Sequence, residues 1–423
     1  MPTTYYGLAG RFYKPKICNG TPILPLTSRK LPEEKLSVWG SLTVLTRITN
    51  YMIQIVPAHT KKLVHAFAKF PFSLYRNHPY WVPPIIDAEL ASWDKSKNPV
   101  FDHAEADFFL AYKDDQLVGR VACIVNHTEV KQQGIAKMRF GWFDFIDNYQ
   151  VSSALLNHVA EYGRQRGLAF MEGPVGFSNL DKVGVMTSGF DHIGTMITWY
   201  NHTYYADHYR RFGMTKEKGY LESKFLLSSI DGNKYNRLAQ IVAERFKLKT
   251  LNFKKTAELL PYTDAMFDLF NQTYASLSSF VPIAQKEKEY MTKQFIGFIN
   301  PSYIKFVVDE HDKMVGFAIT MPSFSKALQK AKGKLFPWGW WHLIQAKKNN
   351  PDAVFYLIGV LPEYQNKGVT ALLFDAYYKT YLKEGVVTCY RTPELEDNTA
   401  IMKLWVDFNP EVHQTRCTFK MDL

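Results

Sequence analysis

The chain has 423 residues, of which 46% are hydrophobic and 22% charged, an ordinary globular composition with room for two or three domains. No apolar run approaches the ~20 residues that cross a bilayer, which argues against a membrane-spanning helix. Four scattered cysteines without a C-x-x-C pair argue against a zinc site or a disulfide scaffold and fit a reducing cytoplasm. The formal net charge of +11 favours anionic ligands, including anionic lipid and RNA.

Residues 1–51 differ from the rest of the chain. They carry seven basic and two acidic side chains, and therefore supply +5 of the net charge. Because no helical or strand period persists in them, we expect a poorly ordered tail without a secretory signal. A strand-like start at 52–56 suggests that the native chain begins at Met52, and the intact mass of the native protein would test this.

Residues 52–230, the first half, are predicted to form one α/β unit. The pattern indicates a helix over 60–75, a hairpin of strands 107–112 and 117–125, and a strand over 139–146. A helix over 150–166, a strand over 168–171, a helix over 204–214 that Gly213 ends, and a strand over 220–227 follow.

Residues 231–423, the second half, repeat this order of elements. Strands are expected at 249–253, 304–308, 314–320, 354–360 and 386–390, and helices at 262–275, 286–298, 369–383 and 398–408. The pair Val118-Gly119 in the first hairpin returns as Val315-Gly316 in the second. The sequence therefore predicts two copies of one α/β (α+β) fold, each a mixed, mostly antiparallel sheet flanked by helices.

The junction between the strand 354–360 and the helix from Val369 is suited to bind a phosphate. It turns at Pro362 and passes through Gln365-Asn366-Lys367-Gly368. A helix N-terminus presents unpaired N–H groups with the positive end of the helix dipole behind them. An ordinary strand-to-helix turn is the alternative.

The pattern Val-x-Pro-x-x-Gln-x-x-Gly-x-Thr over 360–370 resembles the acyl-CoA loop of the GNAT superfamily of N-acyltransferases. Gln365 and Gly368 match that loop, and Thr370 stands where a second small residue is expected. The resemblance implies acetyl-CoA or a long-chain acyl-CoA as co-substrate, and no metal. Pantetheine would lie between strands 354–360 and 386–390, and a backbone N–H near Val360 or Leu361 would polarise the thioester carbonyl. The cofactor-binding residues implied are Val360, Leu361, Gln365, Asn366, Lys367, Gly368, Val369, Thr370 and Asn398.

The two halves retain different parts of the superfamily pattern. Tyr209 of the first half lies four residues before Gly213, as in the helix that usually carries the acidic tyrosine, whereas the second half has Trp405 at that position. The first half has no glycine over 145–152, where its phosphate loop would lie. We expect only the second half to hold CoA in the usual way, with the first half as structural and substrate-binding partner.

Amine transfer also requires a base, because only a neutral amine attacks. Asp181, Asp144 and Glu396 are the candidate carboxylates, and Tyr209 is the candidate acid. Each of these types of residue more often has a purely structural or surface position.

Residues 52–423 further resemble a narrower group of two-domain GNAT-like bacterial proteins that includes bacterial ceramide synthases. The resemblance rests on 74–76 with 81–84, 118–120, 173–174 with 189–191, 204–205, 333–337 and 359–365. It implies transfer of an acyl group from CoA to the primary amine of a long-chain base. Two alternatives stay open: a Fem-type transferase that uses aminoacyl-tRNA, and a non-catalytic acyl-CoA-binding protein.

The segment 326–348 contains three tryptophans and Phe336 between lysines. This composition is typical of the headgroup boundary of an anionic membrane and suggests a cytoplasmic protein with peripheral contact to the inner membrane face. The alternative is a tryptophan cluster packed on the core, with the lysines in solvent. The sequence has no basic helical stripe, which argues against DNA and RNA as partners.

Overall fold

The computed structural model describes residues 52–423 except 179, 278–279 and 297–298. The predicted tail over 1–51 lies outside the described residues, so both its disorder and the start at Met52 stay predictions.

Each half contains three antiparallel strands followed by a parallel one. In the first half β2 (Ala104–Lys113), β3 (Gln116–Asn126) and β4 (Lys137–Phe145) are antiparallel, and β5 (Phe170–Gly173) runs parallel to β4. In the second half β9 (Ile304–Val308), β10 (Met314–Pro322) and β11 (Asp352–Val360) are antiparallel, and β12 (Thr388–Arg391) runs parallel to β11. The predicted repeat of one mixed, mostly antiparallel fold is confirmed.

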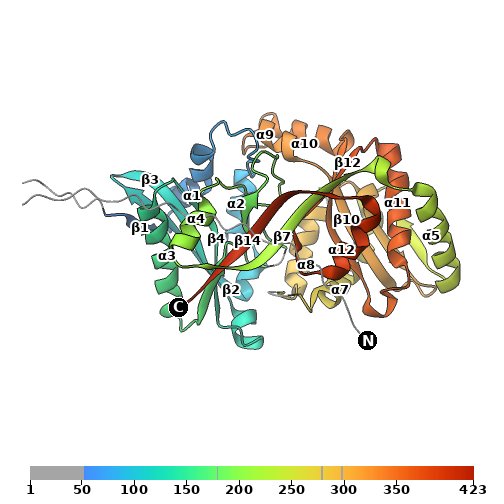
Figure 1. Ribbon diagram of the computed structural model, residues 1–423, viewed down its shortest axis with the longest axis horizontal. Helices are drawn as coiled ribbons and strands as arrows, with labels where there is room; N and C mark the ends of the chain where they lie inside the picture. Colours follow the sequence, from blue (N-terminus) through green and yellow to red (C-terminus); the bar gives the residue numbers. More distant parts are fainter. Residues whose placement is uncertain (1–51, 179, 278–279, 297–298) are drawn as a thin grey trace, which may run out of the picture. The chain divides into compact units, whose positions relative to one another are not determined.

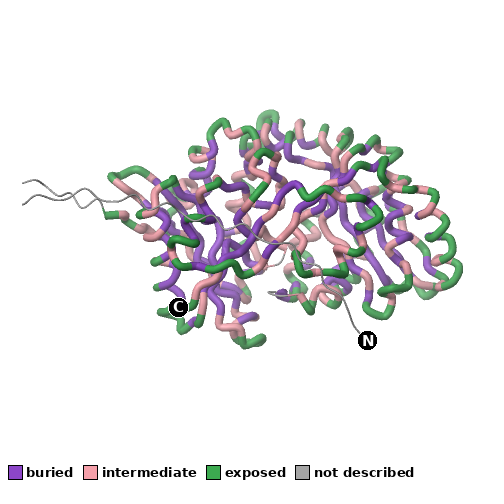
Figure 2. The backbone as a smooth tube through the Cα atoms, viewed as in Figure 1, coloured by how far each residue is buried: buried purple, intermediate pink, exposed green. Residues whose placement is uncertain are grey.

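All these strands join one sheet, ordered β1-β2-β3-β4-β5-β14-β7-β12-β11-β10-β9-β8. Its edges are β1 (Gln54–Pro57) and β8 (Lys249–Asn252), and two short strands, β6 (Val185–Ser188) and β13 (Glu394–Leu395), pair with β14 and β7 respectively. The strands of both halves form a largely buried interior (Figure 2).

The last strands of the two halves are exchanged. β7 (Thr215–Leu226), from the first half, pairs with β12 of the second, and β14 (Glu411–Asp422), the end of the chain, pairs with β5 of the first. β7 and β14 also pair with each other along most of their length, and they cross the middle of Figure 1 together. The halves therefore share backbone hydrogen bonds, and the predicted boundary at 230/231 follows β7 without separating two sheets.

Helices cover the sheet in both halves. The first half has α1 (Lys61–Leu74), α2 (Ile86–Ser92), α3 (Tyr149–Arg164) and α4 (Tyr205–Arg211). The second has α5 (Gly232–Phe246), α6 (Thr256–Leu259), α7 (Thr263–Tyr274), α8 (Gln285–Met291), α9 (Ser325–Ala331), α10 (Gly339–Lys348), α11 (Val369–Glu384) and α12 (Thr399–Trp405). No helix in the described part of the chain is long and apolar enough to cross a membrane.

The repeated Val-Gly pair has the same physical role in both halves. A Cβ at Gly119 would lie 2.8 Å from Leu155 of α3, and one at Gly316 would lie 3.0 Å from Val369 of α11. Glycine thus lets the helix after the third strand approach the second strand closely.

The structure corrects several predicted elements. The helix expected over 286–298 is α8 followed by a π-helical turn over Thr292–Ile296, and its last two residues lie outside the described ones. The elements without a counterpart in the sequence prediction are α2, α5, α6, α9, α10, β6, β13 and β14. Only Tyr235 and Ala239 of α5 are fully buried, although the apolar residues of this helix lie on one face.

Candidate active site

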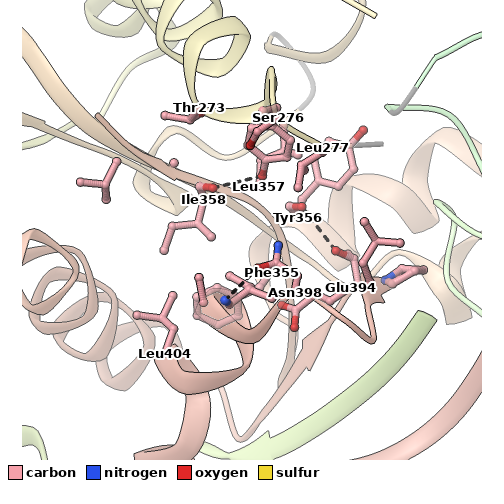
Figure 3. Close-up of a pocket in the computed structure, with 18 of the residues that line it drawn as sticks. Thr273, Ser276, Leu277, Phe355, Tyr356, Leu357, Ile358, Glu394, Asn398 and Leu404 are labelled. Atoms are coloured by element: carbon pink, nitrogen blue, oxygen red, sulfur yellow. Dashed lines mark hydrogen bonds between the residues drawn. The ribbon is translucent and has the colours of Figure 1, made fainter. Parts of the chain in front are cut away.

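A cavity of about 790 Å³ extends from the predicted phosphate loop to the first half. Strand β11 and the start of α11 form one side, and the ends of α7 and α12 line it further along (Figure 3). The first half contributes Glu172 of β5, residues between β5 and β6, Ile197 after β6, and Tyr220 of β7. The cavity is therefore a composite of both halves.

The predicted phosphate loop leads directly into α11, a helix of 16 residues. Gly368 is its N-cap with φ 79°, Asn366 has φ 63°, and no side chain caps the helix. The first N–H groups of α11 are thus left for a ligand, with the helix dipole behind them. A Cβ at Gly368 would lie 2.9 Å from Val242 of α5, so α5 closes the back of the loop.

Most predicted loop residues line the cavity. These are Val360, Gln365, Asn366, Gly368, Val369 and Thr370, together with Asn398, whose side chain accepts from Ile401 N at 3.2 Å at the start of α12. Lys367 does not line it; its Nζ lies 4.7 Å from the ring centre of Tyr364. Its positive charge remains near the loop, where it attracts an anion.

β11 and β12 separate beside the cavity. Their pairing ends at Phe355 and Arg391, whereas β11 continues along β10 to Val360. Opposite Ile319 and Thr320 of β10 stand Leu357 and Phe355, so Tyr356 is an extra residue in β11 and forms a bulge. A bulge re-aims the strand that contains it, and the edge of β11 from Tyr356 to Val360 consequently faces the cavity.

The register identifies which peptide groups point to this edge. Leu361 N donates to Val315 O at 2.9 Å, which makes Val360 and Gly316 a non-hydrogen-bonded pair in the antiparallel ladder. Val360 therefore turns its N–H and C=O away from β10, and its carbonyl accepts from Gln365 Nε2 at 3.1 Å. Of the two predicted carbonyl-polarising groups, Val360 N–H faces the cavity edge, and Leu361 N–H is already paired with β10.

Asp181 enters the same cavity from the first half. Its Oδ2 accepts from Ser178 N at 2.8 Å and from Ser178 Oγ at 3.3 Å. Burial raises the pKa of the Asp181 carboxyl above its usual value, although these hydrogen bonds oppose the shift. A carboxylate with a raised pKa in a cavity is a candidate general base.

The other predicted catalytic residues lie elsewhere. Tyr209 is 0% exposed in the core of the first half, stacked on Phe419, and burial raises its pKa well above the usual value. Glu396 lies at the surface in an ion pair with Lys216 at 2.6 Å. Asp144 is buried, accepts from Arg120 Nε at 2.8 Å and from Tyr75 Oη at 3.0 Å, and so has a structural role.

Trp405, at the position of the usual tyrosine, closes one wall of the cavity. It is 1% exposed, and its Nε1 donates to Glu394 Oε1 at 3.0 Å. Burial raises the pKa of Glu394, and an ion pair with Arg391 opposes that shift. No phenol occupies this position, as the sequence indicates.

Sequence reasoning missed several polar groups in the cavity wall, among them Glu394, Tyr274 and Tyr356. Tyr274 Oη donates to Ile358 O at 3.1 Å, on the separated edge of β11, and Tyr356 Oη donates to Leu180 O at 3.1 Å. Burial raises the pKa of Tyr274 to about 12, so this phenol stays protonated near neutral pH. The end of a predicted helix could have pointed to Tyr274, but nothing local pointed to Glu394.

Comparison with solved structures defines the class of fold. A tandem GNAT protein from the clavulanic acid biosynthesis pathway, solved without acetyl-CoA, superimposes with a TM-score of 0.52 at 13% identity, covering 88% of this chain and 98% of that one. The chain therefore has the tandem GNAT fold, and the predicted resemblance is confirmed at the level of the fold.

Two curated proteins are similar in sequence to most of this chain. One is the protein YghO of Escherichia coli K12, 24% identical over 84% of this chain and 92% of its own length. The other is a bacterial ceramide synthase of Caulobacter vibrioides, 23% identical over 75% of this chain and 83% of its own length. No family model matches the chain.

Proposed function

We propose that the protein is an acyl-CoA-dependent N-acyltransferase that moves a long-chain acyl group from CoA to a primary amine. One observation carries the proposal: the uncapped N-terminus of α11 and the separated edge of β11 open into a single cavity that Asp181 enters from the first half. A phosphate site, a strand edge for the pantetheine amides and a carboxylate are the three groups that this reaction needs.

The residues present fit acyl-CoA. The N–H groups at the start of α11 would hold the pyrophosphate, and the edge of β11 from Tyr356 to Val360 would pair with the amides of pantetheine, as a strand added to a sheet does. Bound acyl-CoA supplies an activated acyl thioester.

The chain's own groups then direct the transfer. Asp181 accepts a proton from the amine as the nitrogen forms a C–N bond with the acyl carbon and the C–S bond breaks. Val360 N–H stabilises the negative charge that grows on the carbonyl oxygen. The thiolate departs as an anion and is protonated by water, because Trp405 offers no acidic group at the position where a tyrosine is usual.

Two observations support a long-chain substrate. The relative from Caulobacter vibrioides is a bacterial ceramide synthase. In addition, the cavity wall is largely apolar beyond the loop, with Leu180, Ile197, Leu277, Leu357 and Leu404 among its lining residues. Apolar walls favour burial of a hydrocarbon chain.

Turnover tests the proposal. The protein would be incubated with palmitoyl-CoA or acetyl-CoA and a set of amines, and free CoA would be measured with a thiol reagent. We expect release that requires a long-chain primary amine and is faster with palmitoyl-CoA. Saturable CoA binding without release for any amine would replace the proposal by the non-catalytic alternative. Transfer of an aminoacyl group from tRNA to an amine, without release of CoA, would replace it by the Fem-type one.

A further inference from the structure

Six large apolar side chains extend from the segment that connects β10 to β11. They are Leu335, Phe336, Trp338, Trp340, Trp341 and Ile344, and we call them the aromatic surface; Phe336 is 82% and Trp338 70% exposed. α9 and α10, which flank the loop between them, lie next to each other in Figure 1. The structure thus places these tryptophans at the surface and not in the core.

The segment that bears the aromatic surface is anchored firmly. Leu328 of α9 and Leu343 of α10 are buried in the core of the second half. Gln329 Nε2 donates to Trp81 O at 3.0 Å, and Gly333 O accepts from Ile86 N at 2.9 Å. Both helices and the loop are therefore held against the first half as well, and the outward aromatic side chains are a built feature of the fold.

Lysines flank the aromatic surface on both sides along the chain. Residues 326–348 contain six lysines and no carboxylate. Lys330, Lys332 and Lys334 precede the aromatic residues and are exposed, and Lys347 and Lys348 follow them at the end of α10. Exposed apolar side chains flanked along the chain by lysines indicate an interaction site for a partner of the opposite charge.

We propose that the aromatic surface is a docking site for an anionic lipid membrane. Indole rings favour the headgroup boundary, apolar side chains enter the acyl region, and lysines meet lipid phosphates. A second copy of the chain is a poorer partner, because a symmetric contact through this surface would bring the two sets of lysines together.

The aromatic surface is connected to the cavity, so docking would bring the cavity to the membrane. Ser325 Oγ, at the start of α9, donates to Gly194 O at 2.8 Å, and Ile197, three residues further on, lines the cavity. Docking would hold the cavity close to the membrane, where a long-chain amine resides. This use rests on the proposed function, whereas the docking itself does not.

Co-sedimentation with sucrose-loaded vesicles tests the docking. The full chain would be mixed with vesicles of phosphatidylcholine alone or with an equal amount of phosphatidylglycerol. We expect binding to the anionic vesicles that weakens with salt. The double variant Phe336→Ser/Trp338→Ser should lower the partition at least tenfold, whereas Leu382→Ser/Val406→Ser, which removes exposed apolar side chains elsewhere, should not change it.

A charge-matched pair completes the experiment. Lys330→Gln/Lys334→Gln should weaken binding by about fivefold per lysine, and Lys61→Gln/Lys383→Gln, with the same change in net charge, should have little effect. The basic tail is identical in all variants, so it cannot produce these differences. Equal binding of the Phe336/Trp338 variant would overturn the proposal. The proposal would also fail if the parent chain did not bind vesicles but self-associated, and the Phe336→Ser/Trp338→Ser variant did not self-associate. The aromatic surface would then be a dimer interface.

CoA release with a long-chain primary amine dispersed in detergent, measured without vesicles, reports on the proposed function separately. The Phe336→Ser/Trp338→Ser variant should retain that release, so that loss of docking and loss of catalysis are distinguishable.

Discussion

Asn366 lets the charge at the phosphate loop be changed without a change in shape. Its backbone has φ 63°, a conformation that both Asn and Asp tolerate, and its side chain is exposed beside the start of α11. We expect Asn366→Asp to weaken CoA binding about tenfold, equivalent to about 1.4 kcal/mol, because the new carboxylate repels the pyrophosphate. Isothermal titration with CoA would measure the change.

Asn409→Asp is a matched control for that substitution. Asn409 also has a left-handed backbone, with φ 50°, is exposed, and lies outside the cavity lining. Its variant should bind CoA as the parent chain does. If the parent chain, Asn366→Asp and Asn409→Asp bound CoA with equal affinity, the phosphate site would not be at this loop.

The raised pKa of Asp181 predicts the form of the pH profile. Only the ionised carboxylate can accept the amine proton, so kcat/KM should fall as the pH decreases through the raised pKa of Asp181. Asp181→Asn should abolish this acidic limb together with most of the activity. Glu396→Gln, a change in a surface ion pair, should preserve it. Protonation of the amine gives a separate limb at higher pH in every variant, because only a neutral amine attacks; a limb below it that survives Asp181→Asn would assign the base elsewhere.

The same carboxyl predicts a change in stability of opposite sign to the change in activity. A folded-state pKa above the usual value of 3.8 means that ionisation costs the folded state more than the unfolded one, so stability falls as the pH rises from 3.8 through the raised pKa. Asp181→Asn removes this cost. We expect a higher Tm for the variant at pH 7 and a difference that shrinks toward pH 4, measured by thermal unfolding; a lower Tm at pH 7 would indicate a structural role.

At the scale of elements, the close contact between β10 and α11 positions the phosphate loop. A Cβ at Gly316 would lie 3.0 Å from the Val369 side chain in the first turn of α11. Gly316→Ala should therefore destabilise the protein by about 1–3 kcal/mol and also weaken CoA binding, because the start of α11 must shift. Denaturant unfolding and CoA titration would measure the two effects.

Gly119→Ala separates stability from binding. Gly119 occupies the equivalent position in the first half, 2.8 Å from Leu155 for an added Cβ, but α3 has no phosphate loop at its start. This variant should lose stability and retain its affinity for CoA. If both variants lost affinity equally, the effect on CoA binding would be a general consequence of instability.

The sequence predicted the elements of the site better than their surroundings. The strand, loop and helix from 354 to 383 are correct within two residues because apolar period, proline and glycine mark them locally. α5, which closes the back of the loop through Val242, was not predicted, although its apolar residues lie on one face; only the tertiary structure shows that it packs against α11. The bulge at Tyr356 also escaped prediction, because it depends on pairing with β10.

At the scale of the whole molecule, the exchange of β7 and β14 links the halves. Residues 231–423 alone would lack β7, which pairs with β12, and their β14 would lose β5. We expect each fragment, 52–230 and 231–423, to be insoluble or unfolded when expressed alone and to form a soluble complex when the two are co-expressed. Gel filtration and circular dichroism would show this.

A native-like spectrum and a sharp unfolding transition for residues 231–423 alone would contradict that prediction. The intact chain should unfold in one cooperative transition, because neither half can open its sheet without breaking strand pairs with the other.

By itself the sequence determined what is local or repeated: the two copies of one fold, the strand, loop and helix around Gly368, and a tryptophan, Trp405, at the position where the resemblance led us to expect a tyrosine. Only the tertiary structure decided which candidate acid or base reaches the cavity. It brings Asp181 to the cavity and leaves Tyr209 in the core and Glu396 at the surface. The physical reason is that burial and proximity depend on contacts between residues far apart in the chain, above all on the exchanged strands, and no local pattern encodes these contacts.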